Sequence, residues 1–149
     1  MHHRVRFSNV EDIALGDDIY IGPGCQIFGH GGLEICDGTV LGANVTIIAS
    51  NHRFEGQRLS MLPFDDDSGR TGVKVAEGAW IGQNTIILPG VVIGKHSVVA
   101  AGSVVTRDTS PGSISGGTPA REIRKRDLPP GYYDLPYWAA YKSKRFHLY

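Results

Sequence analysis

Aliphatic side chains recur at every sixth position over most of this chain of 149 residues. Twelve positions on this six-residue grid all hold Val, Ile or Leu: Leu15, Ile21, Ile27, Ile35, Leu41, Ile47, Val75, Ile81, Ile87, Ile93, Val99 and Val105. The grid slips by two residues at Leu33-Glu34 and is interrupted from Arg53 to Lys74. A short fixed period of this kind is the signature of a repeat architecture.

The other columns of the grid indicate what the repeat builds. Gly or Ala often follows the aliphatic residue, and small residues such as Cys25, Thr39 and Ser97 occupy the fifth column. Three hexads then form one triangular coil, in which glycines provide unusual dihedrals at the corners. Coils stack by parallel pairing at about 4.8 Å. We predict an all-β chain of four full coils, with a partial coil at 5–14; an ordinary β-sandwich, the alternative, does not hold one phase for so long.

This pattern resembles the left-handed parallel β-helix of hexapeptide-repeat acyltransferases. The resemblance implies the left hand, although parallel crossovers are in general right-handed. It also implies a β-helix acyltransferase domain at 1–126 with an extruded loop at 53–74, followed by a short helical or irregular C-terminal tail at 127–149. Outward aliphatic residues such as Ile48 and Ile86 need cover in so short a chain. The family packs three helices side by side, so we expect a homotrimer.

Composition excludes several classes of partner. Fifteen basic residues balance fifteen acidic ones, so there is no global charge signal for nucleic acid or for a membrane surface. Cys25 and Cys36 lie inside the repeat, where we expect small buried fillers rather than a disulfide. The sequence contains neither a secretory signal pattern nor a long apolar run. We therefore expect no nucleic-acid partner, no membrane insertion and a cytoplasmic location.

The interruption of the grid carries the functional signal. It begins directly after Ser50-Asn51-His52 and has the Gly, Pro and Asp content of a loop. Loops of this length in a compact repeat are usually functional. Together with Ala-Trp-Ile-Gly at 79–82 and Gly-Thr-Pro-Ala at 117–120, the Asn-His pair resembles galactoside, maltose and related xenobiotic acetyltransferases over residues 12–125. The resemblance implies acetyl-CoA as co-substrate and no metal.

His52 is the predicted catalytic residue. Acyl transfer to a hydroxyl needs a base, and a neutral imidazole with an ordinary pKa of about 6.5 can take the proton during attack on the thioester. The family transfers the acyl group directly, and backbone N–H groups hold the oxyanion of the tetrahedral intermediate. We predict His52 as general base, at the edge of a rigid coil; the alternative is a surface histidine beside a loop.

The acceptor is less well defined by the sequence. The galactoside branch of the family carries an acceptor-binding Asn on the previous coil, and Gly24 stands at the matching position. A simple galactoside or maltose acceptor is therefore in doubt. Asn51, Gln26 and His30 are the predicted acceptor contacts, although His30 precedes Gly31-Gly32 and could instead be a turn residue.

The family's coenzyme groove lies between adjacent subunits along the last coils. The resemblance implies pantetheine contacts from Trp80, Gln83 and the main chain of Ala101. Residues expected near the nucleotide are Thr106, Arg107, Arg121 and Arg124. Arginines there would bind phosphate oxygens through charge-assisted hydrogen bonds. Alternatively, the basic run at 121–126 is the solvated face of a short terminal helix.

The C-terminal tail is rich in aromatic and basic residues, which indicates either a clasp on the helix flank or on a neighbouring subunit, or an aromatic wall for a sugar. We expect an acetyl-CoA-dependent O-acetyltransferase acting on a saccharide or a surface-polysaccharide sugar unit. The chain lacks the N-terminal helical segment common in the galactoside branch, which favours the polysaccharide type.

Three alternatives stay open. The first is an amino-sugar N-acetyltransferase or a drug O-acetyltransferase on the same scaffold. The second is a γ-type carbonic anhydrase, although His30, His52 and His96 show no closely spaced zinc-binding pair, and His96 is expected to be exposed at a corner. The third is a non-catalytic trimeric subunit.

Overall fold

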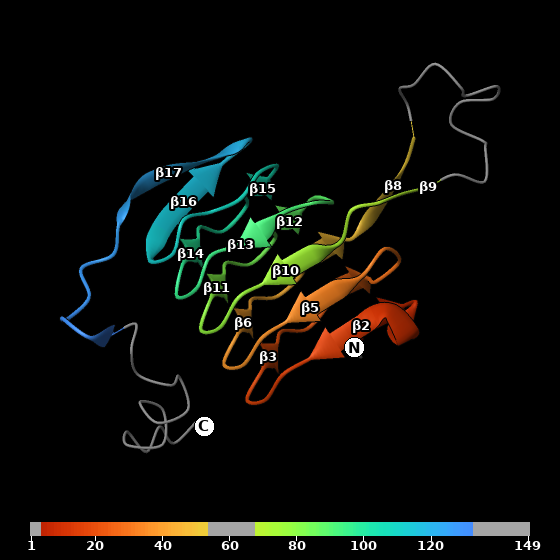
Figure 1. The fold of residues 1–149 in the computed structure, drawn as a ribbon, viewed down its shortest axis with the longest axis horizontal. Helices are drawn as coiled ribbons and strands as arrows, with labels where there is room; N and C mark the ends of the chain where they lie inside the picture. Colours follow the sequence, from red (N-terminus) through yellow and green to blue (C-terminus); the bar gives the residue numbers. More distant parts are fainter. Residues whose placement is uncertain (1–3, 54–67, 133–149) are drawn as a thin grey trace.

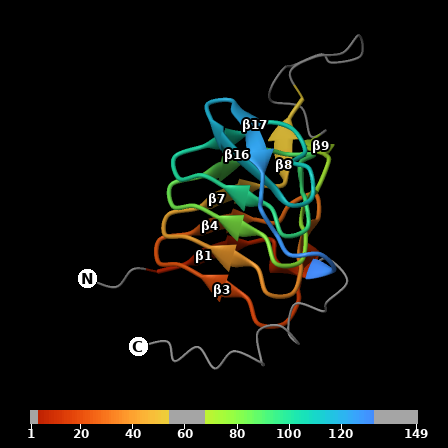
Figure 2. The same ribbon diagram turned by 90° about the vertical axis from the view of Figure 1, so that its left-hand side faces the viewer.

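Three parallel sheets wind around one axis to form a β-helix of about five turns (Figures 1 and 2). The computed structural model describes residues 4–53 and 68–132. Among these residues, the one helical element is the short 3-10 helix η1 (Val10–Asp12). The all-β, parallel β-helix predicted from the six-residue grid is confirmed, and so is the left hand that the resemblance implied. No helix in the described residues is long and apolar enough to cross a membrane.

Each of the first four turns contributes one strand to each of the three sheets, and the fifth turn contributes strands to sheets A and C. Sheet A contains β1 (Arg6–Ser8), β4 (Gln26–Phe28), β7 (Thr46–Ile48), β12 (Ile86–Ile87) and β15 (Val104–Val105). Sheet B contains β2 (Ile13–Leu15), β5 (Leu33–Ile35), β10 (Val73–Val75) and β13 (Val92–Ile93). Sheet C contains β3 (Tyr20–Ile21), β6 (Val40–Leu41), β11 (Trp80–Ile81), β14 (Val98–Val99), β16 (Ser113–Gly117) and β17 (Ala120–Lys125).

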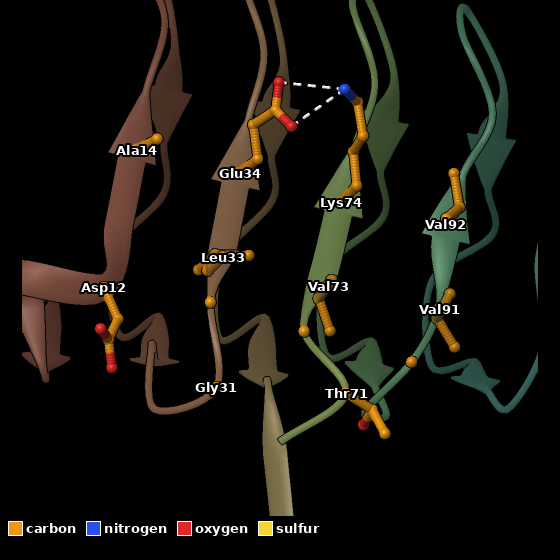
Figure 3. Close-up of a pocket in the computed structure, with 13 residues that line it drawn as sticks. Asp12, Ala14, Gly31, Leu33, Glu34, Thr71, Val73, Lys74, Val91 and Val92 are labelled. Atoms are coloured by element: carbon orange, nitrogen blue, oxygen red, sulfur yellow. Dashed lines mark hydrogen bonds and ion pairs between the residues drawn. The ribbon is translucent and has the colours of Figure 1, made fainter.

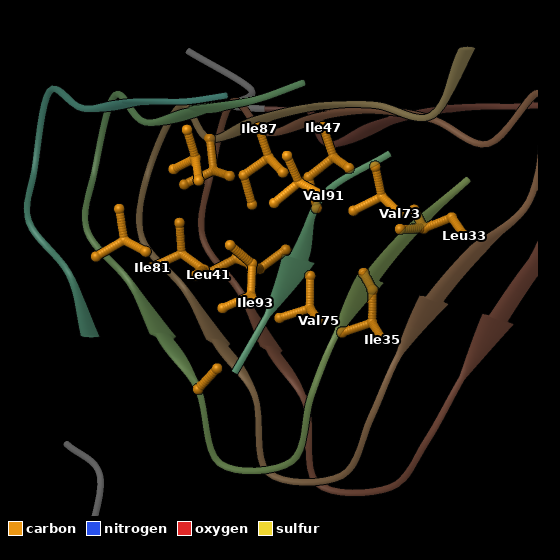
Figure 4. Packing of buried hydrophobic residues seen from close by; sticks show 14 of the residues in the cluster. Leu33, Ile35, Leu41, Ile47, Val73, Val75, Ile81, Ile87, Val91 and Ile93 are labelled. Carbon is orange, nitrogen blue, oxygen red and sulfur yellow. The ribbon is translucent and has the colours of Figure 1, made fainter. Parts of the chain in front are cut away.

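The gridded aliphatic residues stack in register and form the core (Figure 4). In sheet A, Ile47 pairs with Ile27 on one side and with Ile87 on the other, and all three side chains are fully buried. The first coil has no coil beneath it, so Leu15 stays 51% exposed although it occupies a grid position. Burial of each Ile or Leu contributes about 1.5–3 kcal/mol, which makes the repeated row the main stabilising element.

The glycines that follow the grid residues are required by close approach between coils. A Cβ on Gly42 would lie 2.7 Å from the backbone nitrogen of Gln83, and one on Gly82 would lie 2.5 Å from that of Ala101. The expectation that these glycines supply unusual dihedrals is wrong. Positive φ values occur two residues further on, for example 57° at Asn84 and 72° at Gly102.

The corner between sheets A and B, called the AB corner below, carries every insertion in the described coils. It holds η1 in the first coil, residues 29–32 in the second, and the hairpin of β8 (Ser50–His52) and β9 (Ser68–Arg70) in the third. This hairpin projects away from the coils as a stalk (Figure 1). The two-residue slip of the grid at Leu33-Glu34 is thus a widened corner.

The last coil ends in an antiparallel hairpin rather than in a helix. β16 pairs with β14 on one side and with β17 on the other, and Ala120 at the start of β17 is buried. The alternative expectation of a terminal helix for residues 121–126 is therefore wrong. Without β17, the edge of β16 opposite β14 would expose unpaired main-chain donors and acceptors, and β17 satisfies them.

Candidate functional site

His52 is the last residue of β8, on the stalk rather than on a coil. β8 and β9 are antiparallel, and His52 pairs with Ser68 across the hairpin. The side chain is exposed, and its backbone N–H donates to the Oδ1 of Asn51 at 2.9 Å. The expectation that His52 stands on the rigid edge of a coil is therefore wrong. It stands one step outside the AB corner, on the hairpin.

His30 lies at the same corner, one coil below the stalk. The backbone N–H of Val73 donates to the oxygen of Gly32, so the His30 turn abuts the return of the stalk. His30, Asn51 and His52 therefore share one corner. Gln26 lies on the exposed outer face of β4 in sheet A, away from that turn.

Gly24 lies at a different corner, between sheets C and A, called the CA corner below. It has φ of 78° and occupies the same column as Asn44 and Asn84, whose side chains are hydrogen-bonded at 3.2 Å. A Cβ on Gly24 would collide with the Oδ1 of Asn44. An acceptor-binding Asn at this position would therefore need Asn44 to move.

Two of the predicted pantetheine contacts stack at the CA corner. Gln83 and Ala101 occupy consecutive coils there, and the backbone N–H of Gly102 donates to the oxygen of Gln83 at 2.9 Å. Trp80 begins the same hexad on the outer face of sheet C and is 54% exposed. All three residues are exposed.

The predicted nucleotide contacts divide into two groups. Thr106 and Arg107 lie at the AB corner of the last coil, and Arg107 lines a hollow of about 190 Å³ together with Arg121 of β17. Arg124 pairs with Ile114 further along β17 and is not among the residues lining that hollow. All four side chains are exposed. Two cations thus converge at the end of the β-helix.

A larger hollow, of about 460 Å³, lies on the outer face of sheet B at the foot of the stalk (Figure 3). None of the predicted site residues lines it. An ion pair between Lys74 and Glu34, 2.9 Å from nitrogen to oxygen, crosses this face, and the hydrogen bond lowers the pKa of the Glu34 carboxyl. The sequence analysis missed this pair. Each member directly precedes a grid residue, so the hexad phase could have indicated that they align.

Two further expectations concern buried groups. Cys25 and Cys36 are free thiols, as expected, and Cys25 is fully buried, which raises its pKa. His96 was expected to be exposed, and that is wrong: it is 1% exposed, at the corner between sheets B and C, called the BC corner below. His30 and His52 lie at the AB corner, so the three histidines do not converge within one chain.

Known proteins contain the same six-residue repeat. Residues 72–107 match the profile of a family described as bacterial transferase hexapeptide (six repeats). This part of the chain therefore carries the hexapeptide repeats of that family. A galactoside O-acetyltransferase of Escherichia coli (strain K12) is 31% identical over 134 residues, which are 89% of this chain and 64% of that protein.

Two solved structures share the hexapeptide-repeat fold. A maltose O-acetyltransferase from Clostridium difficile 630 matches with a TM-score of 0.73 at 30% identity, over 84% of this chain and 65% of that chain. A hexapeptide-repeat acetyltransferase from Vibrio cholerae O1 biovar eltor, solved with acetyl coenzyme A, matches with a TM-score of 0.72 at 29% identity, over 81% and 64%. This chain spans between about half and two thirds of the length of the curated relatives that it matches.

Proposed function

We propose that this protein is an acetyl-CoA-dependent O-acetyltransferase that acetylates a hydroxyl of a saccharide or of a surface-polysaccharide sugar unit. The observation that carries this proposal is the position of His52 on a stalk that leaves an otherwise regular coil, preceded by Asn51. The similarity to galactoside and maltose O-acetyltransferases supports the reaction type. The solved relative with acetyl coenzyme A supports the acyl donor.

The chemistry assigns one proton transfer to His52. Its imidazole takes the proton of the acceptor hydroxyl while the hydroxyl oxygen forms a bond to the thioester carbonyl carbon. The carbonyl oxygen carries the negative charge of the tetrahedral intermediate and accepts hydrogen bonds from backbone N–H groups. The carbon–sulfur bond then breaks, the imidazolium returns its proton to the sulfur, and the products are the acetyl ester and free coenzyme A.

The distribution of the site residues favours a site shared by two subunits. His52 and Arg107 belong to the AB corner, whereas Gln83 and Ala101 belong to the CA corner. One side of the triangle is a hexad, so the two corners are separated by roughly 15–20 Å at about 3.3 Å per residue. A coenzyme that contacts both sets is accommodated when the AB corner of one chain meets the CA corner of the next.

This arrangement defines a homotrimer with sheet A facing the threefold axis, because sheet A is the side that joins the AB and CA corners. The outer face of sheet A suits that environment. Phe28 is 38% exposed, Ile86 is 36% exposed, and Ile48 and Val104 are half-buried. Exposed apolar rows of this kind mark contact surfaces in proteins of this size.

The test of the proposed function is an acceptor screen that follows free thiol release from acetyl-CoA. Oligosaccharides and sugar nucleotides with free hydroxyls should release thiol, and mass spectrometry should find an ester-linked acetyl group that mild alkali removes. An alkali-stable amide on an amino sugar would instead show that the enzyme transfers the acetyl group to nitrogen. No thiol release with any acceptor, combined with no change in melting temperature on addition of coenzyme A, would contradict an acetyltransferase.

A further inference from the structure

A groove of about 360 Å³ runs along the BC corner and has no role in the proposed reaction. Its floor is lined by Ala14, Leu15, Cys36 and the main chain of Ile35, whose side chain points into the core, and its walls include Glu34, Asp37 and Glu77. Leu15 is 51% exposed, so the floor is apolar and accessible. A groove of this kind combines an apolar surface with carboxylates placed to bind cations.

Negative charge predominates along this corner. Corner residues of successive coils are aligned by hydrogen bonds, for example from Gly78 N–H to the oxygen of Asp37 and from His96 N–H to the oxygen of Glu77. Five carboxylates belong to the corner and its groove: Asp17, Asp18, Glu34, Asp37 and Glu77. Two of them are paired with lysines, Glu34 with Lys74 and Glu77 with Lys95. A net negative strip therefore extends over the first three coils.

The described chain already runs down this same corner after β17. The backbone N–H of Arg126 donates to the oxygen of Gly112 in the fifth coil, and its guanidinium Nη1 donates to the oxygen of His96 in the fourth, at 2.7 Å each. Tyr132 then packs edge to face on the His96 ring, with centroids 4.9 Å apart. Residues 126–132 thus descend from the fifth coil to the fourth, toward the groove.

We propose that residues 133–149 of this chain dock in the BC-corner groove of their own subunit. These residues lie outside the described part of the structure, and their composition complements the groove. They contain three cations, Lys142, Lys144 and Arg145, against one carboxylate, Asp134. Tyr137, Trp138 and Tyr141 supply the aromatic surface that would cover Leu15.

Reach and tethering both favour docking within the subunit. Three coil spacings separate the fourth coil from the first, about 14 Å at 4.8 Å each, and about five extended residues cover that distance. The cations begin ten residues after Tyr132, so they can reach the Asp37 and Asp17 coils. A tethered segment experiences an effective concentration in the millimolar range, which favours the adjacent groove over that of another subunit.

Disulfide trapping tests this docking in the full-length chain, with native Cys36 as the reporter in the groove. Single substitutions Ala140→Cys and Ser143→Cys place a thiol in the tail, while Cys25 is fully buried and does not compete. Under mild oxidation we expect an intramolecular disulfide to Cys36, seen as a monomer of altered mobility on a non-reducing gel and confirmed by peptide mass. A disulfide requires Cβ atoms about 3.5–4.5 Å apart, so trapping reports true proximity.

The matched control moves the reporter to the CA corner of the same coil, with Cys36→Ser combined with Ala43→Cys. We expect trapping at Cys36 at least tenfold faster than at position 43, and a loss of about that factor when Lys142, Lys144 and Arg145 are all changed to Glu. Equal rates at both corners, rates that ignore the charge reversal, or disulfides that join two chains would each overturn the proposal. None of these readouts depends on acetyltransferase activity, so the proposed function can fail separately.

Discussion

The imidazole ring of His96 meets the phenol ring of Tyr132 at an interplanar angle of 72°, inside a corner where the neighbouring coils place Gly38, Gly78 and Gly112. His96 and these three glycines all have positive φ, and of the four His96 is the one that carries a side chain. Burial lowers the pKa of the His96 imidazole, Lys95 and Arg126 act in the same direction, and Glu77 opposes them.

This contact predicts a dependence of stability on pH. Because the pKa of His96 is lower in the folded protein than its ordinary value of 6.5, the unfolded chain binds the proton more readily. The free energy of unfolding should therefore be maximal above about pH 6.5 and fall as the pH decreases toward the folded-state pKa. Thermal melts at pH 8 and pH 5.5 measure the difference.

The control for this effect is His96→Asn, because Asn44 and Asn84 show that Asn accepts the corner conformation at φ of 57°. The variant should lose part of the pH dependence that the parent shows. Equal loss of melting temperature in parent and variant between the two pH values would contradict a role for this histidine.

His52→Ala should lower kcat by about 10²–10⁴-fold, because the acceptor hydroxyl loses its general base. The comparison is His30→Ala, at the same corner one coil below, which should raise the KM for the acceptor more than it lowers kcat. Steady-state kinetics with saturating acetyl-CoA separates the two. A His52→Ala enzyme that keeps its kcat would remove this residue from the reaction.

Arg107→Ala combined with Arg121→Ala should raise the KM for acetyl-CoA by roughly 10–100-fold, since hydrogen bonds to charged groups contribute about 1.5–3 kcal/mol. The KM for acetyl-pantetheine, which has no nucleotide phosphates, should not change. The control is Lys74→Ala, which removes a cation from sheet B. It should leave the KM for acetyl-CoA and the KM for acetyl-pantetheine unaltered. An equal rise with both donors would show that the arginines do not contact phosphate.

Light scattering should give a mass three times the 16.1 kDa of one chain. Ile86→Glu should dissociate the trimer, because it places a charge on the outer face of sheet A against the threefold axis. Val92→Glu, at comparable exposure on sheet B, should leave the trimer intact. A monomeric parent protein, or dissociation by both substitutions alike, would be inconsistent with the shared site.

Gly82→Ala should lower the free energy of unfolding by about 1–3 kcal/mol, because the added methyl group forces apart two hydrogen-bonded coils. Gly102→Asn is the control: it occupies the column that holds Asn44 and Asn84, and a Cβ there meets no atom within 4 Å. Its loss of stability should be smaller than that of Gly82→Ala, because Asn is among the residues that best tolerate a positive φ. Chemical denaturation of both variants checks the difference.

The six-residue period predicted the coils because it reports a local regularity that repeats with every turn. It predicted burial for Ile47 and Ile81 correctly, and overestimated it for Leu15, which lies in the first coil of the described residues and is covered on one side only. The period did not predict contacts between residues that are distant in the sequence. His96 is buried by residues 126–132, about thirty positions away, and no local pattern around it indicates that contact.

The site was predicted in part for a similar reason. The break in the grid indicated where the chain leaves the coil, but the antiparallel pairing of β8 with β9, which carries His52 outward, depends on residues on both sides of the loop. The strand β17 carries Arg121 and Arg124 because β16 offers it an edge. Its sequence has neither a helical stripe nor a clear alternation to reveal this.

The AB corner accommodates segments of very different length without changing the phase of the coils that follow. Ile27 to Ile35 spans eight positions, Ile47 to Val75 spans twenty-eight, and Ile87 to Ile93 spans six, yet the strands after each corner pair in register. The polypeptide at this corner is therefore exchangeable: its length and sequence can diversify, by evolution or by grafting, while the stacked coils keep their geometry.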